Sequence, residues 1–225
     1  MNSQPTKRLR IALLCNGYTF EAWEAACIRE VLDLPFTEVV LLIAPPENKE
    51  TAPGFFQKLQ RYSWKHFLWN RLDKKSKKVP ARRGENLQET LTGVPLIYCT
   101  PEVKGKYSEY FTANDIQRIR DHRPDVILRF AYNIIRGEIL TVAPYGVWSF
   151  HHADEQQIRG GPGAFWEIQL GYHATGALLQ RLTDKLDAGI VLRKGRFPTI
   201  QHSYRHNLDQ LLWGTVSWMK QVCVD

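Results

Sequence analysis

Short apolar runs alternate with amphipathic stretches along most of this chain. Seven runs have the length and apolar content of buried strands: residues 9–15, 39–44, 94–99, 125–130, 146–151, 174–182 and 190–192. Four stretches have apolar residues at helical spacing: 20–32, 113–122, 135–142 and 162–170, the last with a proline in its first turn. This alternation predicts an α/β fold with a doubly wound, mostly parallel sheet of the Rossmann-like class.

A further helix is predicted at residues 203–222. Ser203 is a favourable N-cap, and one stripe of apolar side chains follows it: Leu208, Leu211, Leu212, Val216, Met219 and Val222. Trp213 and Trp218 lie beside this stripe, so the helix packs either on the core or against a second copy in a homodimer. The chain shows no internal repeat and no linker, so we expect residues 1–225 to form a single domain.

The composition is that of an ordinary globular protein. Of its 225 residues, 44% are hydrophobic and 24% are charged. The longest apolar stretch, residues 39–44, is far shorter than the roughly 18–20 residues of a membrane span, and no signal peptide is evident. The cysteines are too widely spaced for a disulfide framework or a zinc site, so we expect reduced thiols in a cytoplasmic protein: Cys15, Cys27, Cys99 and Cys223.

The net charge of +7 comes from one segment. Residues 54–83 hold ten Lys or Arg against one acid, Asp73, whereas the rest of the chain has 20 basic and 22 acidic residues. Apolar and aromatic residues recur there at largely helical spacing: Phe55, Phe56, Leu59, Tyr62, Phe67, Leu68, Trp69 and Leu72. This pattern predicts an inserted basic amphipathic helix that binds an anionic membrane surface, a phosphate-bearing acceptor or RNA, or else packs its aromatic side on the core.

Candidate chemistry is concentrated in the second half of the chain. The first strand is followed by Asn16-Gly17-Tyr18, which is not a glycine-rich nucleotide fingerprint. Titratable groups gather instead at one strand end and in two glycine-rich loops, where a parallel sheet places its site: His151, His152, Asp154, Arg159 and Asp187. Taken alone, each of these residues is commonly found in a purely structural role. Adjacent strand residues point to opposite faces, so we do not expect a metal site from the histidine pair.

In order along the chain, these residues resemble the motifs of the folate-dependent formyltransferases, whose catalytic domain serves methionyl-tRNA, glycinamide ribonucleotide and nucleotide-sugar substrates. That family ends a strand with Asn-x-His, closes a loop with Arg-Gly, and continues to a Thr-Gly strand and an Asp-x-Gly loop. The corresponding segments are residues 149–151, 159–160, 175–176 and 187–189. His151 and Asp187 are 36 residues apart, a separation similar to the family's. The resemblance covers roughly residues 9–200, interrupted by the basic insertion.

The resemblance implies transfer of a formyl group from 10-formyltetrahydrofolate to an amino group of a small acceptor such as an amino sugar. His151 would be the catalytic imidazole and Asp187 its carboxylate partner, which raises imidazole basicity, while Ser149 takes the place of the family asparagine that steadies an oxyanion. The residues expected to bind the cofactor are Arg129, Phe130, Ala131, Tyr132, Asn133, Ile134 and Asp184. A nucleic-acid partner is not expected, because a transfer-RNA formyltransferase usually has an additional C-terminal domain and this chain ends at Asp225.

Two features depart from the family pattern. Ser149 is a shorter donor than asparagine, and residues 153–156 replace the family's Ser-Leu-Leu-Pro loop. The chain is therefore either a divergent branch or a scaffold with changed chemistry. Three hypotheses stay open: formyl transfer, a deformylase-type hydrolysis, and a catalytically silent module that docks through the basic helix. Arg129 and Arg136 are candidates for binding a carboxylate or phosphate, or are ordinary surface salt-bridge partners.

Overall fold

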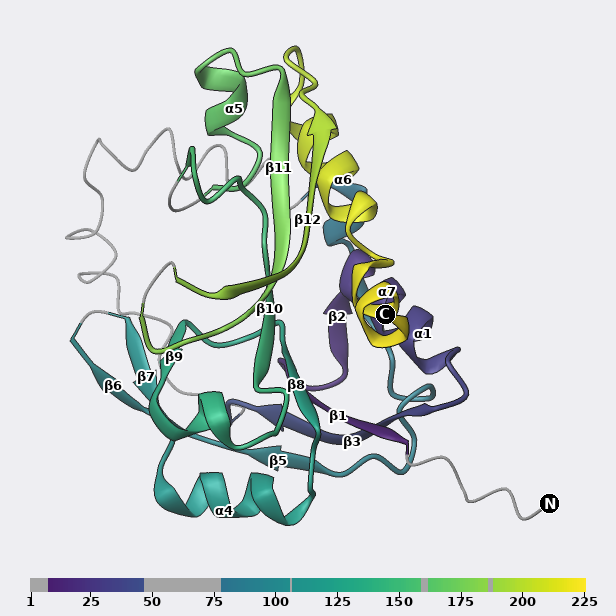
Figure 1. The fold of residues 1–225 in the computed structure, drawn as a ribbon. Helices are drawn as coiled ribbons and strands as arrows, with labels where there is room; N and C mark the ends of the chain where they lie inside the picture. Colours follow the sequence, from purple (N-terminus) through teal and green to yellow (C-terminus); the bar gives the residue numbers. More distant parts are fainter. Residues whose placement is uncertain (1–7, 47–77, 106, 159–161, 186–187) are drawn as a thin grey trace, which may run out of the picture.

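A seven-stranded sheet forms the centre of the computed structural model, which describes residues 8–46, 78–105, 107–158, 162–185 and 188–225 (Figure 1). In spatial order its strands are β12 (Ile190–Pro198), β11 (Ala174–Arg181), β10 (Val147–His151), β8 (Val126–Arg129), β1 (Leu9–Leu14), β3 (Thr37–Ala44) and β5 (Leu96–Tyr98). The pairs from β10 to β5 are parallel, and β11 and β12 extend the sheet as an antiparallel hairpin. The predicted α/β class with a mostly parallel sheet is confirmed.

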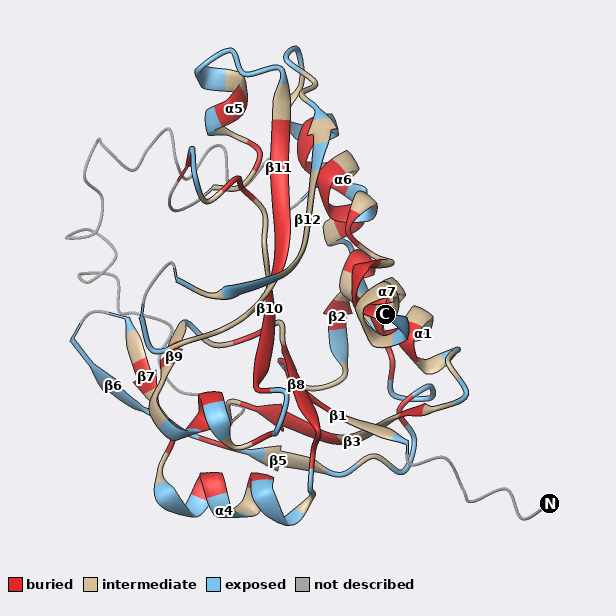
Figure 2. Ribbon diagram, in the orientation of Figure 1, coloured by how far each residue is buried: buried red, intermediate tan, exposed pale blue. Residues whose placement is uncertain are grey.

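Apolar residues on both faces of the sheet explain why helices cover it twice. In β1, Ile11 and Leu13 face a core shared with α1 (Ala22–Leu32), while Ala12 and Leu14 face the core under α4 (Ala113–Asp121). Figure 2 shows that β8, β10 and β11 are buried over most of their length. The parallel strands have their carboxyl ends on the same side of the sheet, and the loops that follow these strands meet there.

Two small sheets were not predicted from the sequence. β2 (Thr19–Glu21) pairs with β4 (Gly84–Asn86), and β6 (Glu102–Lys104), β7 (Ser108–Tyr110) and β9 (Ile134–Arg136) form a three-stranded sheet. The helix predicted at residues 135–142 is therefore wrong in its first part. Gly137 has φ +76° after β9 and breaks the segment, so that only η3 (Gly137–Thr141) is helical, as a 3-10 turn.

Two elements of the second half differ in length from prediction. α5 (Trp166–Gln169) is shorter than the helix predicted at residues 162–170, because Ala164 has φ +63°, a left-handed conformation incompatible with a right-handed helix. β12 is longer than residues 190–192 and has nine residues, because it pairs with β11 along nearly its whole length. The hairpin is thus a substantial part of the sheet rather than a short addition to it.

The predicted C-terminal helix is divided into α6 (Tyr204–Gly214) and α7 (Trp218–Val224). Ser203 caps α6 as predicted, with its Oγ 3.3 Å from the backbone nitrogen of His206. α6 ends at Thr215, whose hydroxyl donates to the carbonyl of Leu212 at 2.9 Å. The buried residues of the predicted stripe belong to the same core as β1: Leu208, Leu211, Leu212 and Met219. The stripe therefore packs on the sheet, and a homodimer stays a prediction.

The basic insertion is only partly visible. Residues 54–77 of this segment lie outside the described residues. At its described end, η2 (Pro80–Arg82) is attached to the domain: Arg82 pairs with Glu21 at 2.8 Å, and the Ala81 nitrogen donates to Asp209 Oδ1 at 2.8 Å. In the part of the chain that the structure describes, no helix combines the length and the apolar character needed to cross a bilayer.

Asn207 provides a test of how α6 is fixed to the sheet. Its buried amide joins three segments, with bonds to Ile200 N (2.9 Å), Ala164 O (3.0 Å) and Thr175 Oγ1 (3.0 Å). Asn207→Ala removes the partner of the Ile200 nitrogen and of the Ala164 carbonyl, while Thr175 Oγ1 keeps Thr199 Oγ1 at 2.9 Å, so we expect the free energy of unfolding to fall by about 2–4 kcal/mol. Urea denaturation measures this loss against Gln210→Ala, which removes one exposed hydrogen bond. Equal midpoints for the two variants would contradict the assignment.

Candidate active site

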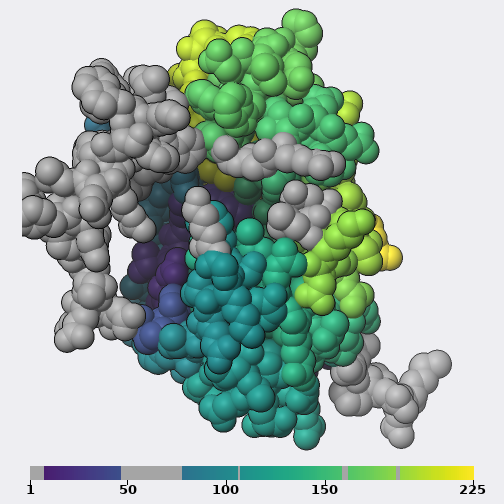
Figure 3. Space-filling view, turned by 90° about the vertical axis from the view of Figure 1, so that its left-hand side faces the viewer, coloured from purple at the N-terminus to yellow at the C-terminus, as the bar shows by residue number. Residues whose placement is uncertain are grey.

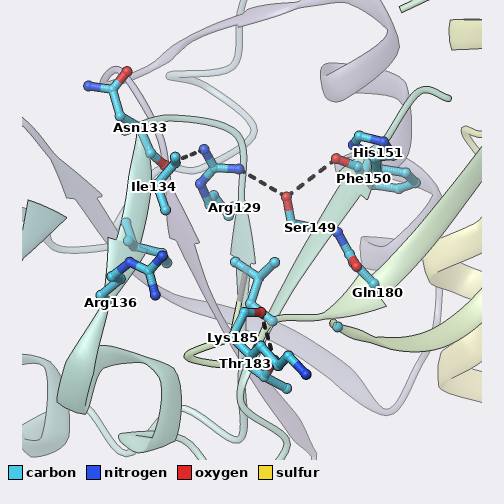
Figure 4. A pocket seen from close by; sticks show the side chains of 13 residues that line it. Arg129, Asn133, Ile134, Arg136, Ser149, Phe150, His151, Gln180, Thr183 and Lys185 are labelled. Carbon is cyan, nitrogen blue, oxygen red and sulfur yellow. Dashed lines mark hydrogen bonds between the residues drawn. The ribbon is translucent and has the colours of Figure 1, made fainter. Parts of the chain in front are cut away.

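A cavity of about 200 Å³ lies at the carboxyl ends of β8 and β10, where a parallel sheet places its ligands (Figure 4). Three parts of the chain line it. β8 contributes Arg129, and β9 with the residue before it contributes residues 133–136. β10 contributes residues 149–151. The β11–β12 hairpin contributes Gln180, Leu182, Thr183, Lys185 and Gly189. The cavity therefore collects residues that are up to 60 positions apart in the sequence.

A second recess of about 440 Å³ lies at the carboxyl ends of β1 and β3. It is lined by residues 16–19 and 44–46, together with Asn86, Gln88, Leu96 and Tyr98. In Figure 3 the purple N-terminal residues are visible at the bottom of a hollow between the teal and green parts of the chain. The loop Asn16-Gly17-Tyr18, which carries no nucleotide fingerprint, thus forms a cavity wall.

Strand register brings three polar side chains together in the first cavity. Ser149 on β10 is paired with Arg129 on β8 and with Gln180 on β11. Because residues directly opposite one another in a sheet share a face, the three side chains form a row across the strands. Ser149 is 3% exposed, and His151, two residues along β10, lies on the same face and lines the cavity.

Arg129 is the partly buried centre of this row. Its Nη1 donates to Ser149 Oγ at 3.0 Å, and its Nη2 donates to the carbonyls of Tyr132 (2.7 Å) and Asn133 (2.5 Å). Its Nε is buried without a hydrogen-bond partner. Burial lowers the pKa of Arg129, and the negative charge of Glu109 partly opposes that shift. Ser149 accepts from Arg129 and makes only a long, 3.4 Å contact with the Phe150 carbonyl, so its proton can turn toward a ligand.

The residues predicted to bind a cofactor separate into two groups. Arg129, Asn133 and Ile134 line the cavity. Phe130 instead packs on Trp23, with ring centroids 5.8 Å apart, and Ala131 is 6% exposed in the core. Tyr132 packs on Phe111 at 5.2 Å and donates its hydroxyl to the Cys99 carbonyl at 3.2 Å. Asp184 does not line the cavity: its Oδ1 accepts from the Gly137 nitrogen at 3.0 Å.

The loop that contains Asp187 is described only at its two ends, because residues 186 and 187 lie outside the described residues. The role predicted for Asp187 therefore stays a prediction. Thr183 Oγ1 donates to the carbonyls of Lys185 (3.2 Å) and Ala188 (3.0 Å) and so joins the two ends. A Cβ on Gly189 would lie 2.2 Å from Gln180 Oε1 and 3.0 Å from the Arg181 carbonyl oxygen, so a larger residue here would require the Gln180 side chain to move. The Arg159-Gly160 pair likewise lies outside the described residues.

His152 is partly buried and packs against aromatic residues of the core. Its ring meets Trp23 edge-on at 5.0 Å, stacks on Phe150 at 6.1 Å, and lies 3.4 Å from the hydroxyl of Thr215. Burial, followed by the positive charges of His151 and Arg82, lowers the pKa of His152 from 6.5 to about 3. The ring is therefore neutral and structural at physiological pH.

Asp154 holds the loop after β10 to the hairpin. It is 3% exposed and receives hydrogen bonds from Lys194 (2.8 Å) and Arg196 (2.8 Å). Burial alone raises the pKa of Asp154, but these two cations hold it below its usual range. A Cβ on Gly176 would lie 2.7 Å from the Asp154 Cβ, so the glycine of the Thr-Gly pair permits this contact. Within the described ranges, no three His, Cys, Asp or Glu side chains are grouped to hold a metal ion.

The sequence analysis did not identify Gln180, Thr183 or Lys185 as site residues. Gln180 lies opposite Ser149 only because β10 and β11 pair with this register. Thr183 and Lys185 reach the cavity because the hairpin turns back over it. None of these three residues belongs to a local motif. The only indication in the sequence was that they precede the Asp-x-Gly sequence by a few positions.

Solved structures of other proteins share the fold of this chain. No family model matches the chain. It superposes on phosphoribosylglycinamide formyltransferase from Campylobacter jejuni with a TM-score of 0.63 and 10% identity, covering 98% of each chain. For glycinamide ribonucleotide transformylase 1 from Symbiobacterium toebii the TM-score is 0.59 and the identity 14%, with 96% of this chain and 85% of the other covered.

The chain has the formyltransferase fold. The same fold occurs in a formyltetrahydrofolate deformylase from Pseudomonas syringae, with a TM-score of 0.58 and 14% identity. That superposition covers 96% of this chain and 60% of the deformylase. At these identities the likeness concerns the fold, and it confirms the fold that the ordered motifs predicted. In the formyltransferase fold seen here, Ser149 and His151 lie at the carboxyl end of β10, beside the cavity.

The lowered pKa of His152 predicts that the folded state loses stability at acid pH. Between pH 6.5 and about 3 the unfolded chain binds a proton at this ring that the folded chain excludes, so stability falls as the pH falls through this range. Replacing the ring by phenylalanine removes that proton. We therefore expect the free energy of unfolding of the wild type to lose about 1.4 kcal/mol more per pH unit than that of His152→Phe. Urea denaturation at pH 4.5 and 6 measures the difference, and identical pH slopes would contradict it.

Proposed function

We propose that this protein transfers a formyl group from 10-formyltetrahydrofolate to the amino group of a small acceptor. The observation that carries the proposal is the row Arg129, Ser149 and Gln180, with His151 beside it, at the cavity of a chain with the formyltransferase fold. Two of the structures that share the fold are named as phosphoribosylglycinamide formyltransferase and formyltetrahydrofolate deformylase. Both names concern formyl-group chemistry.

The cavity wall fits the head group of a reduced folate. The donor supplies an activated formyl carbon when it is bound. Consecutive residues of β9, Ile134 to Arg136, line the cavity, and β9 is an edge strand whose single neighbour is β7. An edge strand presents unpaired backbone N–H and C=O groups, which suit the amide-like edge of a pterin ring. A volume of about 200 Å³ is below the ~300 Å³ of a typical drug-sized site, so the cavity holds one part of the folate.

Ser149 and His151 supply the chemical groups of the proposed reaction. Ser149 keeps its hydroxyl proton for a developing oxyanion, because its oxygen already accepts a charge-assisted hydrogen bond from Arg129. This bond polarises the hydroxyl of Ser149, which makes it a stronger donor. His151 receives the proton that leaves the attacking nitrogen, and Asp187 orients the imidazole in this proposal.

The acceptor is the least defined part of the proposal. We place its amine beside His151 and its remainder toward the second recess at the ends of β1 and β3, because ligands of parallel sheets bind across strand ends. An amino sugar is our first candidate. Residues 54–83 are proposed to contact either a phosphate on the acceptor or an anionic membrane surface. A cytoplasmic location and a homodimer complete the proposal.

Hydrolysis of the formyl group is the second candidate function. The fold also occurs in formyltetrahydrofolate deformylases from Pseudomonas syringae and Pseudomonas putida. In that reaction water takes the place of the amine, and His151 removes its proton in the same way. Release of formate from 10-formyltetrahydrofolate without any amine supports hydrolysis. Formyl transfer that requires an amino sugar, with no formate released in its absence, supports the first proposal.

Substitutions at the row test the proposed roles. We expect His151→Ala to lower kcat by about 10²–10⁴-fold, because it removes a positioned base. Ser149→Ala should lower kcat by about 10²–10³-fold, because it removes an oxyanion donor. His206→Ala, on the exposed side of α6, is the matched control and should retain full activity. The assay follows formyl transfer from 10-formyltetrahydrofolate to a panel of amino sugars. Unchanged kcat in the first two variants would refute these assignments.

A further inference from the structure

A cavity of about 390 Å³ lies at the opposite end of the parallel strands from the proposed reaction. We call it the amino-end pocket, because its walls come from residues near the starts of β1, β3, β8 and β10, together with the last turn of α7. The residues that line it are Arg8, Leu9, Phe36, Asp125, Tyr145, Trp148, Val222 and Cys223. None of these residues lines the cavity beside Ser149, so the two sites are separate.

The described walls of the amino-end pocket are mainly apolar. Phe36, Tyr145 and Trp148 contribute aromatic rings, and two aliphatic side chains complete the apolar surface. Burial raises the pKa of the Cys223 thiol to about 11, so the thiol is uncharged at neutral pH and adds to this surface. Sites for small molecules are mostly apolar clefts of about 300–1,000 Å³, with a few polar groups that orient the ligand. The amino-end pocket has this size and this character.

The aromatic wall is held in place by hydrogen bonds within the protein. Trp148 is 7% exposed, and its Nε1 donates to the Tyr145 carbonyl at 2.8 Å. The backbone nitrogen of Tyr145 donates to the Asp125 carbonyl at 2.8 Å, and that of Asp125 donates to the Arg10 carbonyl at 2.7 Å. The starts of β1, β8 and β10 are thus joined without a ligand, so binding would order little additional chain. Tyr145 is 54% exposed, so part of its ring is available to a ligand.

Arg8 is a loosely paired cation of the pocket. Its Nη1 lies 4.0 Å from Glu38 Oε2, whereas the Arg10 Nη1 lies 2.7 Å from Glu38 Oε1. The charge of Arg10 therefore already compensates Glu38, and the Arg8 side chain, which is 61% exposed, can turn to an anion. The carboxylate of the lining, Asp125, is 8% exposed, and its Oδ2 accepts from the Arg10 nitrogen at 3.0 Å. Because that carboxylate is engaged within the protein, Arg8 determines the charge that a ligand meets at the exposed side of the pocket.

We propose that the amino-end pocket binds a small planar aromatic carboxylate, with its ring against Phe36, Tyr145 and Trp148 and its carboxylate at Arg8. Aromatic rings pack favourably on other aromatic rings, and a guanidinium binds a carboxylate through charge-assisted hydrogen bonds. This site goes beyond the proposed function, and it can be tested without formyl transfer. Failure of one proposal leaves the other unaffected.

Binding of 2-naphthoate tests the aromatic part of the site in the full chain. Calorimetric titration gives its affinity for the wild type, Tyr145→Ala and Tyr172→Ala. We expect one saturable site in the wild type and about tenfold weaker binding by Tyr145→Ala, because the ligand loses an aromatic contact. Tyr172 is 36% exposed and lies outside the pocket, so Tyr172→Ala is the matched control and should bind like the wild type. No binding by the wild type, or equal affinities in the three proteins, would overturn the proposal.

A second titration, with 2-naphthamide, tests the charge, because this compound has the same rings without the carboxylate. The wild type should prefer 2-naphthoate by about three- to fivefold, the modest gain expected of an ion pair with an exposed arginine. Arg8→Gln should remove this preference. Arg205 is exposed on α6 outside the pocket, so Arg205→Gln carries the same change in net charge and should keep the preference. Equal affinities of the wild type for the two compounds would overturn the assignment of an anionic ligand.

Light scattering separates this site from an interface between two copies of the chain. A dimeric wild type and a monomeric Tyr145→Ala would show that a second copy covers the pocket, and this result would overturn the proposal. Equal molar masses of the two proteins, together with 2-naphthoate binding that depends on Tyr145, support the small-molecule site.

Discussion

The site depends on the hydrogen bonds made by the partly buried guanidinium of Arg129. It connects β10, through Ser149, to the turn that leads into β9, through the carbonyls of Tyr132 and Asn133. Tyr132 has φ +68°, a strained conformation for a tyrosine, and the two bonds to its loop offset that strain. These hydrogen bonds fix the position of the Ser149 hydroxyl relative to the turn that leads into β9.

A close contact also fixes the loop after β10. Gly176 lies against Asp154 at a distance that leaves no room for a Cβ, because that atom would be 2.7 Å from the Asp154 Cβ and 2.9 Å from its backbone nitrogen. Asp154 in turn binds Lys194 and Arg196 on β12. The buried Asp154 carboxylate thus ties the loop after β10 to two partly exposed cations of the antiparallel hairpin. The glycine of the Thr-Gly motif therefore has a specific geometric reason in this structure.

The sequence was informative where local pattern and tertiary structure agree. Buried strands such as β1, β3 and β8 have continuous apolar runs, and the Ser-x-His sequence at the end of β10 was enough to place Ser149 and His151. β9 was missed because its three residues become a strand only through pairing with β7. The side chains of Phe130 and Tyr132 pack on Trp23 and Phe111, so the cofactor binding predicted for this stretch would use its backbone groups and stays a prediction. The position of Gln180 opposite Ser149 could not be predicted, because it depends on the register between β10 and β11, which no single segment encodes.

We propose that formyl chemistry takes place in the cavity between β9, β10 and the hairpin. A crystal structure of the chain with 5-formyltetrahydrofolate shows directly whether it does. We expect the pterin ring to lie along the open edge of β9 and the formyl group to face Ser149 and His151. A folate bound elsewhere on the molecule, or a cavity that stays free of ligand in crystals grown with saturating folate, would refute this assignment.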